Sequence, residues 1–259
     1  MVFSYWEYVL VYVDDILVFS EHPKAIMEYL EQSYTLKEGS VHEPNEYLGA
    51  VITKWYIEGS DDPTKPRWAM SAEKYIKNAL KDIEATLADT GKQLPSKASN
   101  PFSNTDYRPE LDDSRELDKS RTTYYQGLIG VLRWCVELGR IDIITETTLL
   151  SSFMANPREG HLEQVFHIFA YLKKHLRSFM VFDDTQPNLD GINFKKCDWT
   201  EYYPDAKEAI PPNKPEERGN AVTMTCYVDA SHAGCRVTRR SHTGIIIFIN
   251  RAPIIWYSK

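Results

Sequence analysis

The chain has 259 residues, of which 42% are hydrophobic and 12% aromatic, so it can bury one large core or two smaller ones and is not a disordered chain. Its net charge of −7 argues against a uniformly basic nucleic-acid-binding surface, although local basic patches remain compatible with it. Four scattered cysteines form no Cys-x-x-Cys pair, which argues against a zinc site or a disulfide framework.

The N-terminus lacks the pattern of a signal peptide, and no apolar run approaches the length needed to span a bilayer. We therefore expect an intracellular protein, cytoplasmic or nuclear, that makes no membrane contact.

The first predicted element is a β-hairpin in the stretch from Glu7 to Ser20. Two apolar, β-branched and aromatic runs, 8–13 and 16–19, are separated by Asp14 and Asp15. The two acids are expected at the tip, and the near-continuous apolar runs predict a hairpin buried on both faces. A carboxylate pair beside a core favours a Mg²⁺ site, because hard oxygen ligands suit that ion. The alternative is an ordinary solvated turn.

Helices and one strand are expected in the next part of the chain. Pro23 suits the first turn of a helix, and residues 46–55 read as one strand with Gly49 at a bulge. Ser71 is expected to cap a helix that ends at Gly91. A long connector follows, because residues 93–117 have no periodicity and contain three prolines.

Three further helices are predicted between residues 121 and 177. The first covers 121–138, the second ends near Phe153, and the third begins with Asn156 as its N-cap. Lys174, His175 and Arg177 close the third helix, where positive charge complements the helix dipole. A short strand is expected at 181–184.

The last part of the chain reads as a small sheet after a polar linker. Strands are expected at 222–228, 243–249 and 254–257, and Asp229 follows the first of them. Asp229 is either a metal ligand or a capping residue of the turn. Three arginines in the next loop are either phosphate contacts or solvated turn residues. These are Arg236, Arg239 and Arg240.

Several blocks in this order resemble the C-terminal part of the polyprotein of copia-type retrotransposons. The box Tyr12-Val13-Asp14-Asp15 resembles the Tyr-x-Asp-Asp motif of reverse transcriptases. The stretches 46–49, 124–134 and 153–173 resemble the strand, thumb and connection segments that follow the motif. The stretches 227–234, 239–244 and 256–259 resemble the start of the RNase H domain. Order and spacing agree along nearly the whole chain, which is more specific than any one block.

The resemblance implies roles for individual residues. Asp14 and Asp15 would hold the polymerase Mg²⁺ or Mn²⁺, Asp229 would hold the RNase H metal, and Tyr12 and Val13 would lie near the primer end. The partners it implies are an RNA template, a DNA primer and an RNA–DNA hybrid. Family enzymes also use a third polymerase aspartate upstream and further RNase H acids downstream. The sequence matches neither, so both carboxylate sets are expected to be incomplete.

The expected fold is therefore α+β, with a truncated polymerase palm hairpin, a helical thumb and connection, and an incomplete RNase H-like sheet. The expected units are a partial palm and thumb at 1–90, a connector and helical connection region at 91–185, a linker at 186–220, and the N-terminal part of an RNase H-like domain at 221–259.

The function expected from this reading is that of a reverse transcriptase and RNase H fragment that is inactive alone. One alternative is a nucleic-acid-binding or assembly module that works in trans with an intact polymerase or with missing polyprotein segments. The other is a relic reading frame without function, whose exposed hairpin would aggregate.

Overall fold

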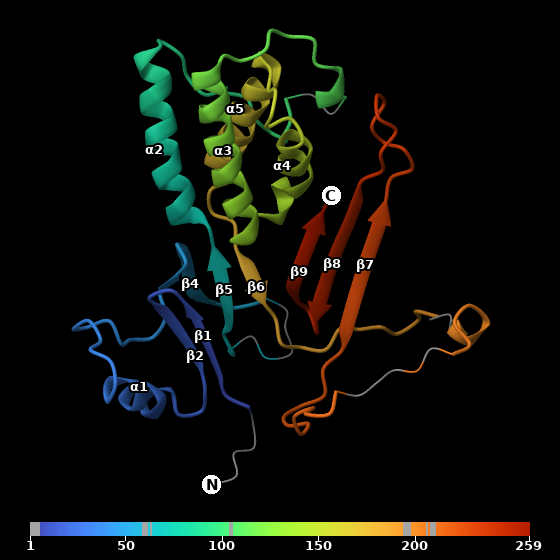
Figure 1. Ribbon diagram of the computed structural model, residues 1–259. Helices are drawn as coiled ribbons and strands as arrows, with labels where there is room; N and C mark the ends of the chain where they lie inside the picture. The colour runs from blue at the N-terminus through green and yellow to red at the C-terminus, as the bar shows by residue number, and fades with distance from the viewer. Residues whose placement is uncertain are drawn as a thin grey trace.

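The computed structural model describes residues 6–58, 62, 64–103, 106–193, 198–205, 207 and 211–259. The fold is α+β, as expected, with helices above a central antiparallel sheet and two smaller antiparallel sheets beside it (Figure 1). Cys197 and parts of the expected linker lie outside the described residues. None of the helices in the described part is both long and apolar enough to cross a membrane.

The central sheet has the strand order β3-β4-β5-β6. The strands are β3 (Glu46–Tyr47), β4 (Ala50–Trp55), β5 (Arg67–Ser71) and β6 (Met180–Phe182). The expected single strand at 46–55 is wrong, because Leu48 and Gly49 both have positive φ angles, of 53° and 84°, and turn the chain into a hairpin. Strand β5 was not expected, since its buried positions include Arg67.

Four helices pack over this sheet and around one another. They are α2 (Glu73–Asp89), α3 (Lys119–Glu137), α4 (Ile144–Ser151) and α5 (Glu159–Lys174), and their apolar faces form the main core. Short 3₁₀ turns lie at η1 (Pro109–Leu111), η2 (Ile141–Ile143) and η3 (Trp199–Glu201). The expectation that α2 ends at Gly91 agrees with the positive φ of that glycine.

The start of α5 differs from the expected one. The N-cap is Arg158 rather than Asn156, and the backbone N–H of Arg158 donates to His161 Nδ1 at 3.1 Å. His161 is buried, and its other ring nitrogen lies 2.9 Å from the Pro109 carbonyl. The helix therefore begins two residues later than expected, and its first turn is held by the contact of His161 with Pro109, which is distant in sequence.

The N-terminal hairpin consists of β1 (Tyr8–Tyr12) and β2 (Asp15–Phe19), followed by α1 (Pro23–Glu31). The expectation that it is buried on both faces is wrong, because every residue of β1 is exposed and β2 is only half-buried. Apart from its hairpin partner β1, the main contact of β2 among the described elements is α1. Apolar composition shows that the strands would be more stable if buried, but it does not show which other segment would cover them.

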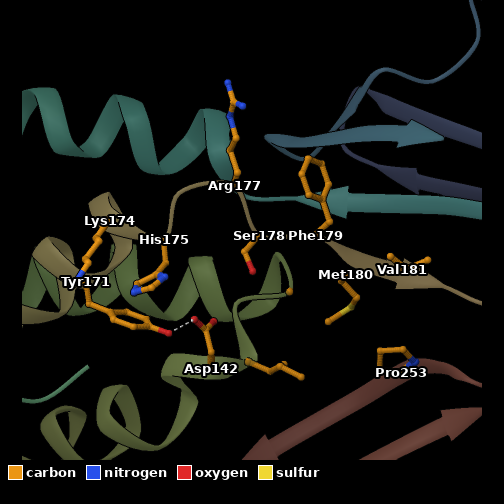
Figure 2. Close-up of a pocket in the computed structure, with 12 residues that line it drawn as sticks. Asp142, Tyr171, Lys174, His175, Arg177, Ser178, Phe179, Met180, Val181 and Pro253 are labelled. Carbon is orange, nitrogen blue, oxygen red and sulfur yellow. Dashed lines mark hydrogen bonds between the residues drawn. The ribbon is translucent and has the colours of Figure 1, made fainter. Parts of the chain in front are cut away.

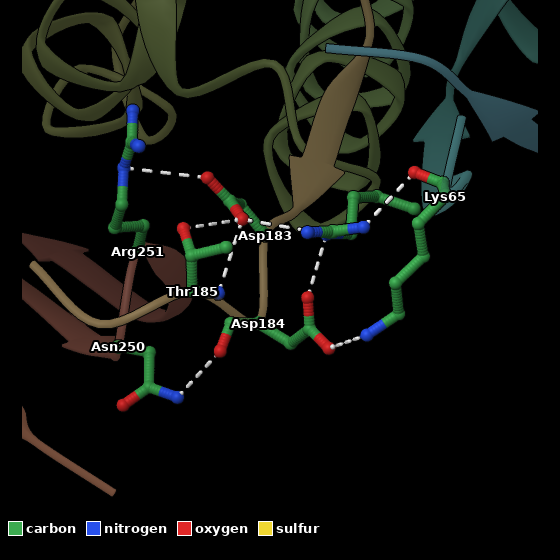
Figure 3. A network of polar contacts seen from close by, with 7 residues as sticks. Lys65, Asp183, Asp184, Thr185, Asn250 and Arg251 are labelled. Atoms are coloured by element: carbon green, nitrogen blue, oxygen red, sulfur yellow. Dashed lines mark hydrogen bonds and ion pairs between the residues drawn. The ribbon is translucent and has the colours of Figure 1, made fainter. Parts of the chain in front are cut away.

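The C-terminal sheet consists of β7 (Met224–Ala230), β8 (Thr243–Ile249) and β9 (Ala252–Ser258), in that order. A polar network joins it to the central sheet (Figure 3). Asp183, just after β6, lies between Arg67 of β5 and Arg251 of the β8–β9 turn. In addition, Trp256 Nε1 donates to the Val136 carbonyl at 2.9 Å, which holds β9 against α3.

Candidate functional site

The acidic hairpin turn consists of Val13 and Asp14. Tyr12 pairs with Asp15, so Asp15 is the first residue of β2 and not part of the turn, which corrects the expected arrangement. Val13 has a φ of 54° and is 87% exposed. A β-branched residue at positive φ is strained, which is the kind of backbone found at functional turns. Tyr12, expected near a primer end, is also exposed.

The carboxylates of Asp14 and Asp15 face solvent at this turn. The part of the chain that the structure describes contains no group of three or more acidic, histidine or cysteine side chains that could hold a metal ion. Two adjacent carboxylates supply hard oxygen ligands, but a two-metal site needs several carboxylates that clamp both ions. The described residues therefore do not form a complete two-metal site.

Tyr47 of β3 is a neighbour of the acidic turn that the sequence did not reveal. Burial raises the pKa of Tyr47, and the negative charge of Asp15 raises it further. An electrostatic effect of this kind requires the two side chains to be near each other. Asp15 of β2 and Tyr47 of β3 therefore lie within electrostatic range of each other.

Asp229 lies on a different sheet from the hairpin acids (Figure 1). It was expected to follow a strand, but it is the sixth residue of β7, where it pairs with Gly244 of β8. Its side chain is exposed. The structure therefore does not bring Asp229 together with Asp14 and Asp15, and the two candidate sites remain separate.

Arg236, Arg239 and Arg240 lie in the loop between β7 and β8. The loop is held by its backbone, because Arg239 N donates to the Cys235 carbonyl and Cys235 N donates to the Arg240 carbonyl. Arg236 N donates to Glu110 Oε1 at 3.0 Å, which ties the loop to η1. None of the three guanidinium groups makes an ion pair with a residue that the structure describes. They remain able to contact an anion.

A cavity of about 640 Å³ lies where the central and C-terminal sheets meet (Figure 2). Its walls come from the end of α5, the segment before α4, strand β6 and Pro253 of β9. Its acid, Asp142, accepts hydrogen bonds from Arg140 at 2.9 and 2.7 Å and from Tyr171 at 3.0 Å. Burial alone would raise the pKa of Asp142, but these hydrogen bonds outweigh it and lower that pKa.

The sequence predicts only that Lys174 and Arg177, which line this cavity, complement the dipole of the helix before them. No local pattern reveals that residues 139–142, 171–181 and 253 meet in space, so the sequence could not predict the cavity.

Comparison with known proteins finds similarity to retrotransposon proteins along nearly the whole chain. A putative transposon Ty5-1 protein of Saccharomyces cerevisiae is 27% identical over 97% of this chain and 65% of its own length. The retrovirus-related Pol polyproteins from transposons RE1 of Arabidopsis thaliana and TNT 1-94 of Nicotiana tabacum are 29% and 23% identical. They align with 97% and 96% of this chain, but with only 14% and 15% of the polyproteins.

The chain thus spans less than two thirds of the length of these relatives. No family model matches the chain. No solved structure matches it either.

Proposed function

From its homology to the Pol proteins of copia-type retrotransposons, we propose that this chain is the segment of a reverse transcriptase that carries the Tyr-x-Asp-Asp hairpin and the beginning of an RNase H-like sheet. The observation that supports this most strongly is the acidic turn at Val13 and Asp14, in a chain of which 97% aligns with such a Pol polyprotein. The strained backbone of Val13 fits a turn kept for function rather than for stability.

In this proposal Asp14 and Asp15 supply only part of the ligands for Mg²⁺. The described residues offer no third acid, so the remaining carboxylates would come from other parts of the Pol polypeptide. The chain alone is then expected to be inactive as a polymerase. Asp229 would have the corresponding partial role in RNase H chemistry, on its own sheet.

The test is primer extension on an RNA template with a DNA primer and Mg²⁺. It compares the chain alone with the longer Pol polypeptide that the proposal requires, each with and without Asp14→Asn and Asp15→Asn. We expect incorporation only by the longer polypeptide, and its loss in the double variant. A matched control, Asp82→Asn with Asp89→Asn on α2, removes the same charge from exposed positions and should leave incorporation unchanged.

Two outcomes would contradict the proposal. Incorporation retained by the Asp14 and Asp15 variant would show that the hairpin is not the polymerase site. Incorporation by the chain alone would show that its own acids complete the site.

A second candidate function is binding of nucleic acid in trans with an intact polymerase. The incomplete acid set at the hairpin favours it, because binding needs cations rather than metal ligands. Salt-dependent binding of an RNA–DNA hybrid by the chain alone, together with the absence of incorporation in every arm of the primer-extension assay, would support this candidate.

A further inference from the structure

Strand β7 forms an open edge of the C-terminal sheet (Figure 1). The strand at the opposite edge, β9, packs against α4 and β6, whereas β8 is the one described element with which β7 makes extensive contact. All but one of the seven residues of β7 are exposed. Met224, Tyr227 and Val228 are 71%, 60% and 64% exposed, so apolar side chains meet solvent on both faces of the strand.

The hydrogen bonds at the two ends of the β7–β8 pair show which backbone groups of β7 face the open edge. Ser231 N donates to the His242 carbonyl, and Asn250 N donates to the Thr223 carbonyl, so residues 223 and 231 face β8. Antiparallel strands use alternate residues on each edge, and the register is continuous along β7, so the odd-numbered residues between them also face β8. The even-numbered residues therefore direct their N–H and C=O groups away from β8. They are Met224, Cys226, Val228 and Ala230.

This edge lacks the features that usually keep a strand unpaired. Proline, lysine or a β-bulge commonly blocks an exposed edge. Strand β7 contains neither proline nor lysine, its register with β8 is unbroken, and its one charged side chain is Asp229. A further strand can therefore form hydrogen bonds along the whole length of β7, as extended segments do when they add to a sheet.

The sequence of β7 is complementary to itself in the antiparallel orientation. A twofold axis through Tyr227, the central residue, overlaps two copies along the full strand and pairs the outward-facing residues of one with those of the other. Cys226 then lies opposite Val228 on one face. On the other face Tyr227 lies opposite Tyr227 of the second copy, and Asp229 lies opposite Thr225, whose hydroxyl can donate to the carboxylate. This register places no like charges opposite each other.

We propose that two copies of this chain associate through β7, paired antiparallel about Tyr227, so that their two three-stranded sheets become one continuous sheet. Antiparallel pairing also places the two β7–β8 loops, which carry Arg236, Arg239 and Arg240, at opposite ends of the interface. Parallel pairing would bring these loops together, and their positive charges would repel each other. The proposal concerns assembly and does not depend on the catalytic role proposed for the acidic hairpin.

The first experiment measures the dissociation constant of the dimer by sedimentation equilibrium over a series of protein concentrations. The variant Val228→Pro removes one outward-facing N–H from each copy and leaves the N–H groups that face β8 in place. Each lost hydrogen bond weakens association about fivefold, so the dissociation constant should rise about 25-fold. The control Val228→Thr changes the same side chain but keeps the backbone N–H, and it should dimerise like the unchanged chain.

The second experiment tests the register by cross-linking and does not depend on the proline variant. In a chain with Cys197→Ser and Cys235→Ser, the change Val228→Cys places a thiol opposite Cys226 of the other copy. Opposite residues of a hydrogen-bonded antiparallel pair have Cα atoms about 5.5 Å apart, within the range that a disulfide spans. Mild oxidation should therefore give a covalent dimer, and peptide mapping should find positions 226 and 228 linked. The control Thr225→Cys lies opposite Asp229 and should give no such dimer.

Several outcomes would overturn the proposal, and none of them depends on the result of primer extension. A chain that stays monomeric at every concentration, or a dimer that Val228→Pro does not weaken, would show that β7 is not the interface. Cross-linking of two copies through Cys226 alone, without the added cysteine, would contradict the register about Tyr227. A cross-link that forms in this chain but not in the longer Pol polypeptide would mean that another strand of that polypeptide, and not a second copy, occupies the edge.

Discussion

The polar network between the two larger sheets offers a quantitative test of the fold (Figure 3). Arg67 is 5% exposed, and its Nε lies 2.6 Å from Asp184 Oδ1 and 3.5 Å from Asp183 Oδ1. These contacts are ion pairs rather than well-aligned hydrogen bonds, since Nε has no hydrogen-bond partner. We therefore consider three variants: Asp183→Asn, Asp184→Asn, and the double change.

The expected cost depends on whether Arg67 keeps a carboxylate. Each single change leaves one acid beside the buried guanidinium group, so each should lower the free energy of unfolding by about 1 kcal/mol. The double change leaves a buried cation without a paired charge, which costs about 3–5 kcal/mol when one side of a buried ion pair is removed. The double variant should therefore lose about 1–3 kcal/mol more than the sum of the single variants.

Urea unfolding followed by tryptophan fluorescence measures these differences in the free energy of unfolding. The slope of that free energy against urea concentration should be the same for every variant, which would show that all of them unfold in the same way. The control is Arg251→Gln, whose side chain is 55% exposed and lies 3.3 Å from Asp183. It should cost less than about 1 kcal/mol, as an exposed ion pair does. Additive costs for Asp183 and Asp184 would refute the reasoning, because they would mean that Arg67 does not depend on a shared pair of acids.

Three other measurements follow from buried groups. Tyr125 is fully buried and donates a 2.7 Å hydrogen bond to a carbonyl of α4, so Tyr125→Phe should lower the free energy of unfolding in urea by about 1 kcal/mol. Burial lowers the pKa of His161, so the unfolded chain takes up the proton more readily. Stability should fall as the pH drops through about 6.5, and less steeply in His161→Gln when urea unfolding is repeated at each pH. Hydrogen bonds from Thr238 lower the pKa of Cys235, whereas burial raises the pKa of Cys135 to about 12. Iodoacetamide labelling with peptide mapping should modify Cys235 in the folded chain, and Cys135 only after unfolding.

The elements that the sequence predicted correctly have strong local signals. The N-terminal hairpin, the start of α1 at Pro23, the stop of α2 just before Gly91 and the three C-terminal strands all follow from short-range patterns of apolar and turn residues. The expected caps Ser71 and Asn156 are wrong, because the N-caps of α2 and α5 are Ala72 and Arg158. Asp14 was correctly expected at a hairpin tip for the same reason, since a turn depends on residues adjacent to it.

The features that the sequence did not reveal depend on distant partners. Strand β5 was missed because Arg67 occupies one of its buried positions, and Asp183 and Asp184, both distant in sequence, supply the charges that make this position tolerable. The cavity brings together residues near 140, 175 and 253, and the charge of Asp15 raises the pKa of Tyr47, which lies on a different sheet. The exposure of β1 has the same origin, because burial requires a neighbour that composition cannot specify.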